Sequence, residues 1–255
     1  MSDLQNVMSL KRTARATGLA YLGLGVAGMI GFLLIRSRLY VPDEAATTMA
    51  NLVEHETLAR LGIIADLILI LMQSLAALWF FKLFRAVNSL AAGAIAAFGF
   101  MNAAAILVAT MFSATALEVA VDDSPAAGDR AATALLLYDL NAAAWGLGSL
   151  FFGLWLIPMG WLAWRSGYMP RLLGWLLIGG GIGYIVSTFV AYLTPSLSAL
   201  AGALTVPATI GEFWMIGYLL AKGVNSRVSE PPPSTGSVQL RTPQPTPAPA
   251  AGTPT

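Results

Sequence analysis

The amino-acid sequence predicts an all-α polytopic membrane bundle of six transmembrane helices with a disordered C-terminal tail rich in proline and threonine. The chain has 255 residues, of which 57% are hydrophobic and 11% are charged, whereas soluble domains contain about 25% charged residues. Charged residues are also absent from several intervals of 20 or more positions, the length that a helix needs to cross a hydrocarbon core of about 30 Å. Both observations exclude a soluble globule, because so apolar a surface requires lipid as its solvent.

The composition also excludes several classes of function. The formal net charge of +1 provides no basic field that would attract nucleic acid. The chain has no cysteine, and His55 is its one histidine. Disulfides, thiolate metal sites and nucleophilic thiols are therefore excluded.

The first predicted span covers residues 16–36. It follows a basic segment, residues 1–15, which we expect to be cytoplasmic, and it ends at Arg36. Signal peptides also have a basic start and an apolar middle, but this segment has full membrane-spanning length and no small-x-small cleavage site follows it. We therefore expect an uncleaved anchor that begins a transmembrane domain over residues 16–223.

The later spans are separated by charged or turn-forming residues. Asn88-Ser89, Ser124-Pro125 and residues 167–170 combine residues that stop one helix with residues that start the next. The interval 172–221 holds a single charge and is long enough for two antiparallel helices that turn near Pro195. The predicted spans after the first are residues 61–81, 89–117, 131–164, 172–194 and 199–221.

Prolines mark both the spans and the tail. Pro158 and Pro207 lie within predicted spans, where we expect them to kink the helices. Eight of the 14 prolines lie between Pro231 and Pro254, so residues 224–255 are predicted to form a disordered cytoplasmic tail without a core. A polyproline ligand for a partner is an alternative, but the composition favours a solvated tail.

The distribution of basic residues predicts the orientation of the bundle. With the N-terminus inside, ten of the 14 basic residues lie in cytoplasmic segments, whereas the outer loops hold four basic and eight acidic residues. Lys and Arg accumulate in the cytoplasmic loops of membrane proteins. We therefore expect both termini to be cytoplasmic.

The segment Gly23-Leu-Gly25-Val-Ala-Gly28 matches the dinucleotide-binding pattern G-x-G-x-x-G, but no strand precedes it and it lies within an apolar span. Glycines in such a span instead allow close approach of neighbouring helices. Gly23, Ala27 and Gly31 share one helical face, as do Gly179 and Gly183. Both sets are predicted to be packing seams.

No motif predicts a metal site, a catalytic residue or a cofactor. His55-Glu56 lacks the second histidine of a zinc-protease helix, and the glycine and acids of the segment 122–129 are misplaced for a calcium loop. The chain also lacks a G-x-S-x-G nucleophile elbow. Whether the chain is an enzyme stays open, and the sequence favours the view that it is not.

Polar residues inside the spans form the candidate site. Asp66, Asp139 and Glu212 lie in the second, fourth and sixth spans, where ionisable groups are costly unless they face the bundle interior. The topology allows them to share one cavity. Their partners would be neutral groups, a bound cation, water, or Arg60 and Arg130 reaching in from the outer boundary. Thr205 and Thr209 fall on the face of Glu212. The candidate binding residues are Asp66, Gln73, Asn102, Asp139, Asn141 and Glu212.

Two interpretations of these residues remain open. They form interhelical hydrogen bonds, which contribute about 0.6 kcal/mol on average in a membrane bundle. Alternatively they form a proton or cation site that opens outward, since carboxylates at membrane depth commonly mark functional sites.

The first outer loop is predicted to contain a short amphipathic helix after Pro42. Ala45, Met49, Leu52 and Val53 fall at helical spacing, with polar residues on the other faces. This helix would cover the mouth of the bundle, as a lid or, as we favour, as an interfacial connector. His55 and Arg60 are the candidate functional residues of this loop, with His55 expected to be solvated.

Several stretches of the chain carry a resemblance: Arg36 to Thr47, Asn51, Glu56 to Asp66, Phe151 to Gly160, Arg165 to Gly174, and Gly183-Tyr184. They resemble a bacterial family of multi-spanning membrane proteins, the domain of unknown function 4386 family. The resemblance covers about residues 10–222 and leaves out the proline-rich tail. It implies a multi-pass protein of the bacterial cytoplasmic (inner) membrane and assigns no catalytic residue.

The leading functional hypothesis is an integral membrane protein that binds or moves a small solute or cation through an acid-containing helical bundle. A structural or accessory membrane subunit is the main alternative, and an intramembrane lipid-modifying enzyme is a weaker one. The expected partners are the lipid bilayer, a small solute or cation, and a helix–helix partner or second copy. Nucleic acid is not expected.

Overall fold

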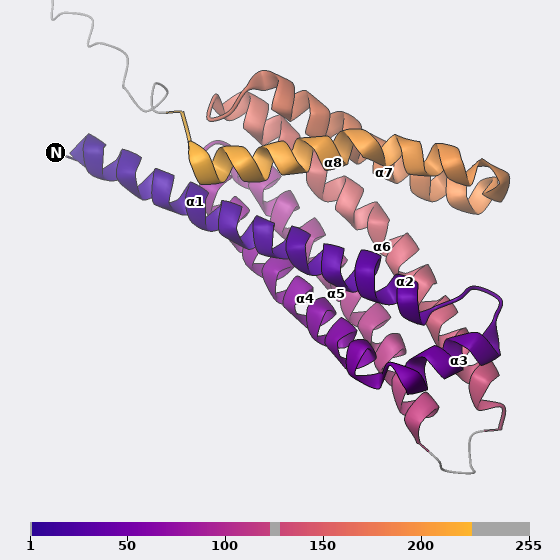
Figure 1. Ribbon diagram of the computed structural model, residues 1–255. Coiled ribbons are helices and arrows are strands. Elements are labelled where there is room, and N and C mark those ends of the chain that lie inside the picture. The colour runs from indigo at the N-terminus through magenta and orange to yellow at the C-terminus, as the bar shows by residue number, and fades with distance from the viewer. Residues whose placement is uncertain (1, 123–127, 226–255) are drawn as a thin grey trace, which may run out of the picture.

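The computed structural model describes residues 2–122 and 128–225. Within these residues it contains six helices that are long and apolar enough to cross a membrane, and it contains no strand (Figure 1). The predicted all-α membrane bundle is confirmed. The predicted disordered tail lies, from residue 226 on, outside the described residues.

The first spanning helix is composite. It begins as α1 (Ser2–Gly28), passes through a π-helical segment (Met29–Ile35) and ends as α2 (Arg36–Leu39). The short helix α3 (Ala45–Glu54) follows in the first loop. The other spanning helices are α4 (Glu56–Phe84), α5 (Ser89–Val121), α6 (Arg130–Ser166), α7 (Arg171–Leu193) and α8 (Ser198–Ala221).

Capping residues set several helix ends. The Asn88 side chain accepts a hydrogen bond of 2.8 Å from the Ala91 amide at the start of α5, and Asp129 accepts one of 3.0 Å from Ala132 at the start of α6. Such caps satisfy amides that have no partner within the helix. Gly167 ends α6 in the left-handed region with φ 67°. The predicted Ser124-Pro125 start of the fourth span lies outside the described residues.

The helices follow one another around a closed ring. Neighbours are in contact in the order α1, α4, α5, α6, α7 and α8, and α8 returns to α1. Figure 1 shows α1 and α8 close together near the N-terminal end of α1 and diverging toward the other end. Gly223, with φ 73°, ends α8 beside Lys11, since a Cβ there would lie 3.6 Å from Lys11 Cγ. Both ends of the described bundle therefore lie on the same side.

Paired glycines bring α6 and α7 into backbone contact. A Cβ on Gly153 would lie 2.7 Å from the Gly181 carbonyl oxygen, and a Cβ on Gly160 would lie 2.5 Å from the Gly174 carbonyl oxygen. In the reverse direction, a Cβ on Gly181 would lie 2.7 Å from the Gly153 carbonyl oxygen, and a Cβ on Gly174 would lie 2.6 Å from the Gly160 carbonyl oxygen. Real Cβ atoms do not approach other atoms so closely, so any larger residue separates the two helices here.

The predicted glycine seams are correct for the first span and partly wrong for the fifth. A Cβ on Gly23 would lie 2.8 Å from Met72 Sδ, and one on Gly31 would lie 2.9 Å from Asp66 Oδ1, so this face packs against α4. Gly183 packs on the Leu204 carbonyl of α8, but no described atom lies within 4 Å of a Cβ on Gly179. Its neighbour Gly180 makes the second contact with α8, because three residues bring a helix back to nearly the same face.

The predicted amphipathic helix of the first loop is α3. Its buried residues are Thr48 and Leu52, and Leu52 joins a second core cluster with Leu39 and Tyr138 at this end of the bundle. Val53, expected on the same face, is 51% exposed, because it lies a further 100° around the helix from Leu52. Thr48, and not Val53, is buried beside Leu52 on this face. The Thr48 Oγ1 donates a hydrogen bond to the Val41 carbonyl and accepts one from the Val41 amide, each at 3.1 Å.

We predict that Gly160→Val lowers the thermal stability of the detergent-solubilised protein. The added side chain has no room at the α6–α7 crossing, so the unfolding free energy should fall by about 1–3 kcal/mol. The matched control is Gly179→Val on the open face of α7. Equal melting temperatures for the two variants, measured on monodisperse protein, would show that the crossing does not depend on the glycines.

Candidate functional site

A cavity of about 730 Å³ lies inside the ring. Every spanning helix of the described chain contributes to its lining. Each helix contributes at least one polar or aromatic residue. In the order α1, α4, α5, α6, α7 and α8, these residues are Tyr21, Gln73, Asn102, Ser149, Tyr184 and Glu212. The cavity therefore contains three of the six candidate binding residues that the sequence identified: Gln73, Asn102 and Glu212.

Glu212 is held by a tyrosine that the sequence analysis did not identify. The Tyr21 hydroxyl donates a hydrogen bond of 2.5 Å to Glu212 Oε1. Tyr21 is buried, and its ring meets the edges of Phe80 and Trp155 with centroids 5.4 and 5.9 Å apart. Because these rings fix its position, Tyr21 orients the carboxyl group of Glu212 from across the α1–α8 contact.

Gln73 is the most unusual group in the lining. Its side chain is 0% exposed, and neither Nε2 nor Oε1 has a hydrogen-bond partner among the described residues. An unsatisfied buried polar group costs about 1–3 kcal/mol. An amide can both donate and accept, but both polar atoms of Gln73 are buried in this structure, so a molecule in the cavity reaches them only after the Gln73 side chain changes position.

Other polar groups of the lining are already engaged. Ser149 of α6 shares a hydrogen bond of 2.8 Å with Thr188 of α7. Thr205 and Thr209 line the cavity beside Glu212, as their spacing predicted, but their hydroxyls donate to the carbonyls of Gly202 and Thr205 at 2.8 and 3.4 Å. Because these hydroxyl groups already bond to other groups of the protein, the main polar side chains of the cavity are Glu212, Gln73, Asn102 and Arg36.

Asp66 belongs to a separate, smaller cavity of about 30 Å³. Arg36 lines this space as well as the large cavity. The Arg36 guanidinium donates from Nη1 to Asn141 Oδ1 at 2.5 Å, and Asn141 Nδ2 donates to the Ala109 carbonyl at 2.6 Å. Arg36 also lies over the rings of Phe32 and Tyr40, at 5.4 and 5.3 Å from their centroids. Asn141 is thus a structural link between Arg36 and α5.

The structure does not bring the three carboxylates into one cavity. Asp139 is exposed, lines neither cavity, and accepts a hydrogen bond of 2.6 Å from the Tyr40 hydroxyl. Burial and this bond to Asp139 raise the pKa of Tyr40 to about 12, so its hydroxyl stays a donor at neutral pH. Asp139 precedes Asn141 by two residues, about 200° around the helix, so the two side chains point in opposite directions.

The cations expected to reach the carboxylates lie elsewhere. Arg60 forms an exposed ion pair of 2.6 Å with Glu56, and Arg130 donates to the carbonyls of Val119 and Ala120 at 3.0 and 2.8 Å. Helical side chains lean toward the helix N-terminus. Arg60 is near the start of α4 and leans outward, whereas Arg36 is near the end of its span and leans back into the bundle.

His55 is exposed between α3 and α4, away from both cavities. In the described part of the chain no group of three or more His, Asp or Glu residues is arranged to hold a metal ion. The charged side chains that line the large cavity are Glu212 and Arg36, and the other polar side chains of its lining are uncharged.

Comparison with known proteins places this bundle in a family. Residues 16–223 match the sequence profile of the family described as Domain of unknown function (DUF4386). The chain belongs to this family, as its sequence resemblance indicated. It is also 33% identical over 89 residues to an uncharacterized protein of Archaeoglobus fulgidus, a match that covers 34% of this chain and 52% of that protein. The match thus spans about half the length of the relative. No solved structure matches the chain significantly.

We predict that Asn141→Leu destabilises this DUF4386 protein more than Asp139→Asn does. The first change keeps the side-chain size but removes both links of Asn141, so the unfolding free energy should fall by about 1–3 kcal/mol. Asp139→Asn keeps a side-chain oxygen that accepts the hydrogen bond from the Tyr40 hydroxyl, and residue 139 is exposed, so this change should cost little. Thermal unfolding in one detergent compares the two, and a larger loss for Asp139→Asn would contradict the assignment.

Proposed function

We propose that this DUF4386 protein binds a small, largely apolar molecule in its large cavity, with a cationic or hydrogen-bond-donating group of that molecule on Glu212. The volume of about 730 Å³ falls within the range of about 300–1,000 Å³ that is common for small-molecule sites. Such sites combine mainly apolar walls with a few convergent polar groups. Glu212, Gln73 and Asn102 are those groups here.

The observation that carries this proposal is the buried amide of Gln73. It shares the cavity with Glu212 and has no hydrogen-bond partner among the described residues. Polar groups at membrane depth are expensive and are commonly functional. A ligand that bonds to both residues would recover the cost of burying Gln73, whereas a purely structural bundle gains nothing from it.

The cavity wall supports entry from the bilayer. Leu33 and Phe213 line the cavity and are 60% and 59% exposed. They come from the first span and from α8, which diverge at this end (Figure 1). An exposed apolar rim of this kind faces hydrocarbon in a membrane. The proposed ligand is therefore amphipathic and soluble in the membrane.

The proposed location is the bacterial cytoplasmic membrane, with both termini on the cytoplasmic side. At one end of the described bundle, basic residues lie in α1, near the ends of α4, α6 and α8, and at the start of α7. Acidic residues lie instead in the first outer loop and in the last turn of α5. The basic residues of this end are Lys11, Arg12, Arg15, Lys82, Arg85, Arg165, Arg171 and Lys222.

A reporter fusion tests this orientation. We expect alkaline phosphatase, which is active outside the cytoplasm, to be inactive when fused after Arg227 and active when inserted after Asp122. A fluorescent protein that folds only inside the cell should give the opposite pattern at the same positions. Active phosphatase after Arg227 would reverse the proposed topology.

We predict that Glu212→Gln and Gln73→Leu reduce the amount of ligand retained by the purified protein. Loss of a hydrogen bond to a charged group costs about 1.5–3 kcal/mol, which is about tenfold or more in affinity. Molecules that copurify with equal amounts of each protein are extracted and compared by mass spectrometry. The matched control is Asp139→Asn, which removes a charge outside the cavity.

The result separates the candidate functions. A compound retained by the native protein and by the control, but depleted in both cavity variants with unchanged melting temperatures, supports the binding site. The same compounds in all four proteins would favour a structural subunit. A lipid that is chemically altered only in cells making the native chain would indicate an enzyme.

A further inference from the structure

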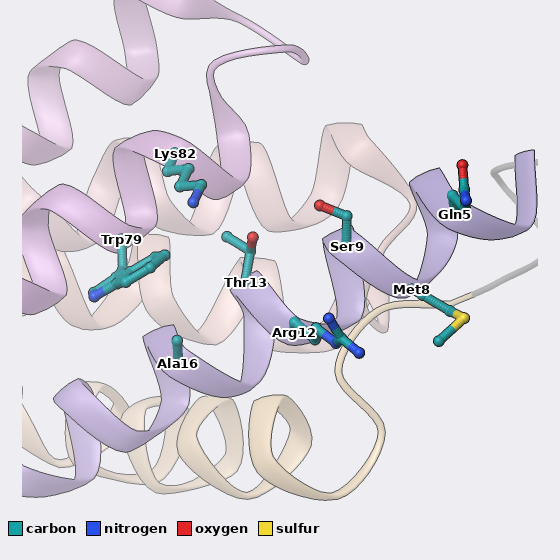
Figure 2. A pocket seen from close by; sticks show the side chains of 8 residues that line it. All are labelled: Gln5, Met8, Ser9, Arg12, Thr13, Ala16, Trp79 and Lys82. Carbon is teal, nitrogen blue, oxygen red and sulfur yellow. The ribbon is translucent and has the colours of Figure 1, made fainter. Parts of the chain in front are cut away.

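A second depression, separate from the large cavity, lies between α1 and α4 at the basic end of the bundle. It measures about 620 Å³. Arg12 of α1 and Lys82 of α4 both line it, together with Trp79 and the hydroxyl-bearing residues Ser9 and Thr13. Figure 2 shows Ser9 and Thr13 extending from α1 on the side where Lys82 and Trp79 extend from α4. We call this depression the Arg12–Lys82 groove.

The groove has a rigid wall and a net positive charge. Lys82 Nζ lies 4.6 Å from the centroid of the Trp79 ring, and Trp79 packs against the main core. Neither Arg12 nor Lys82 has an ion-pair partner among the described side chains. A cation over an indole ring keeps its charge available to an anion, because the ring supplies no negative counter-charge of its own.

The groove also lies at the depth of lipid headgroups. Arg12 is one turn before Ala16, where the apolar part of the span begins, and Lys82 is in the last turn of α4. Below each cation the same helix face continues with an apolar residue turned outward: Leu19 is 61% exposed and Leu78 is 51% exposed. Acyl chains below a bound headgroup would contact these leucines.

We propose that the Arg12–Lys82 groove binds the phosphate of an anionic phospholipid from the leaflet at the basic end of the bundle. The guanidinium and ammonium groups neutralise the phosphate by charge-assisted hydrogen bonds, and the hydroxyls of Ser9 and Thr13 are further donors. Basic pockets between spanning helices bind anionic headgroups in this way. The site is independent of the ligand proposed for the large cavity.

The test uses the purified full-length protein in a neutral detergent, titrated with phosphatidylglycerol and followed by native mass spectrometry. The variant Arg12→Gln/Lys82→Gln should bind phosphatidylglycerol about tenfold more weakly than the native protein. The matched control is Arg165→Gln/Arg171→Gln, which removes the same charge at the same end outside the groove. Arg165 also lies over an indole, 5.3 Å from the Trp161 centroid, so the control removes a similar cation–π pair.

Equal weakening in both double variants would overturn the proposal, because diffuse surface charge would then explain the binding. Phosphatidylcholine that binds as tightly as phosphatidylglycerol would rule out selection for an anionic headgroup. Glycerol phosphate that binds as tightly would indicate a site for a soluble anion instead of a lipid. The conservative variant Lys82→Arg retains the charge and should bind within about twofold of the native protein, which separates loss of charge from misfolding.

Discussion

The hydrocarbon solvent is the constraint on which the rest of this structure depends. A polar group inside the membrane finds no water, so its partner must come from its own helix or from another helix. Thr17, Ser74 and Thr110 donate to carbonyls four residues earlier in their helices. Arg36 and Glu212 instead bond to Asn141 and Tyr21 of other helices. Gln73 has neither kind of partner among the described residues, and it lines the large cavity.

The same solvent is one reason why the contact between α1 and α8 is less extensive than the other helix–helix contacts of the ring. Lipid tails are as apolar as leucine, so helices in a membrane associate through close packing instead of hydrophobic burial. Glycines allow backbone contact between α6 and α7 and between α7 and α8, whereas α1 and α8 share a less extensive contact. Tyr21 and Glu212 form their hydrogen bond across this weaker contact. The proposed ligand group would thus bind where the helices separate most easily.

Much of this fold could be predicted from the sequence, because charge-free length and turn residues depend on local chemistry. The site could be predicted only in part. The spacing of residues gives the angle between side chains on one helix, which is enough to separate Asp139 from Asn141, but it does not identify the neighbouring helix. Tyr21 therefore could not be identified from the sequence as the hydrogen-bond partner of Glu212. Arg36 was recognisable in principle, since a side chain near the end of a helix leans back along it.

The composite first span connects the two proposed sites. At one end of this span, Arg12 lines the Arg12–Lys82 groove. In the middle, Tyr21 orients Glu212, and at the other end Arg36 lines both the large and the small cavity. Its glycine face packs on α4, and the groove lies between the same two helices. A phospholipid bound there would bridge α1 and α4 and stabilise that contact without touching α8. Opening of the α1–α8 side to admit a ligand would then leave the α1–α4 pair intact.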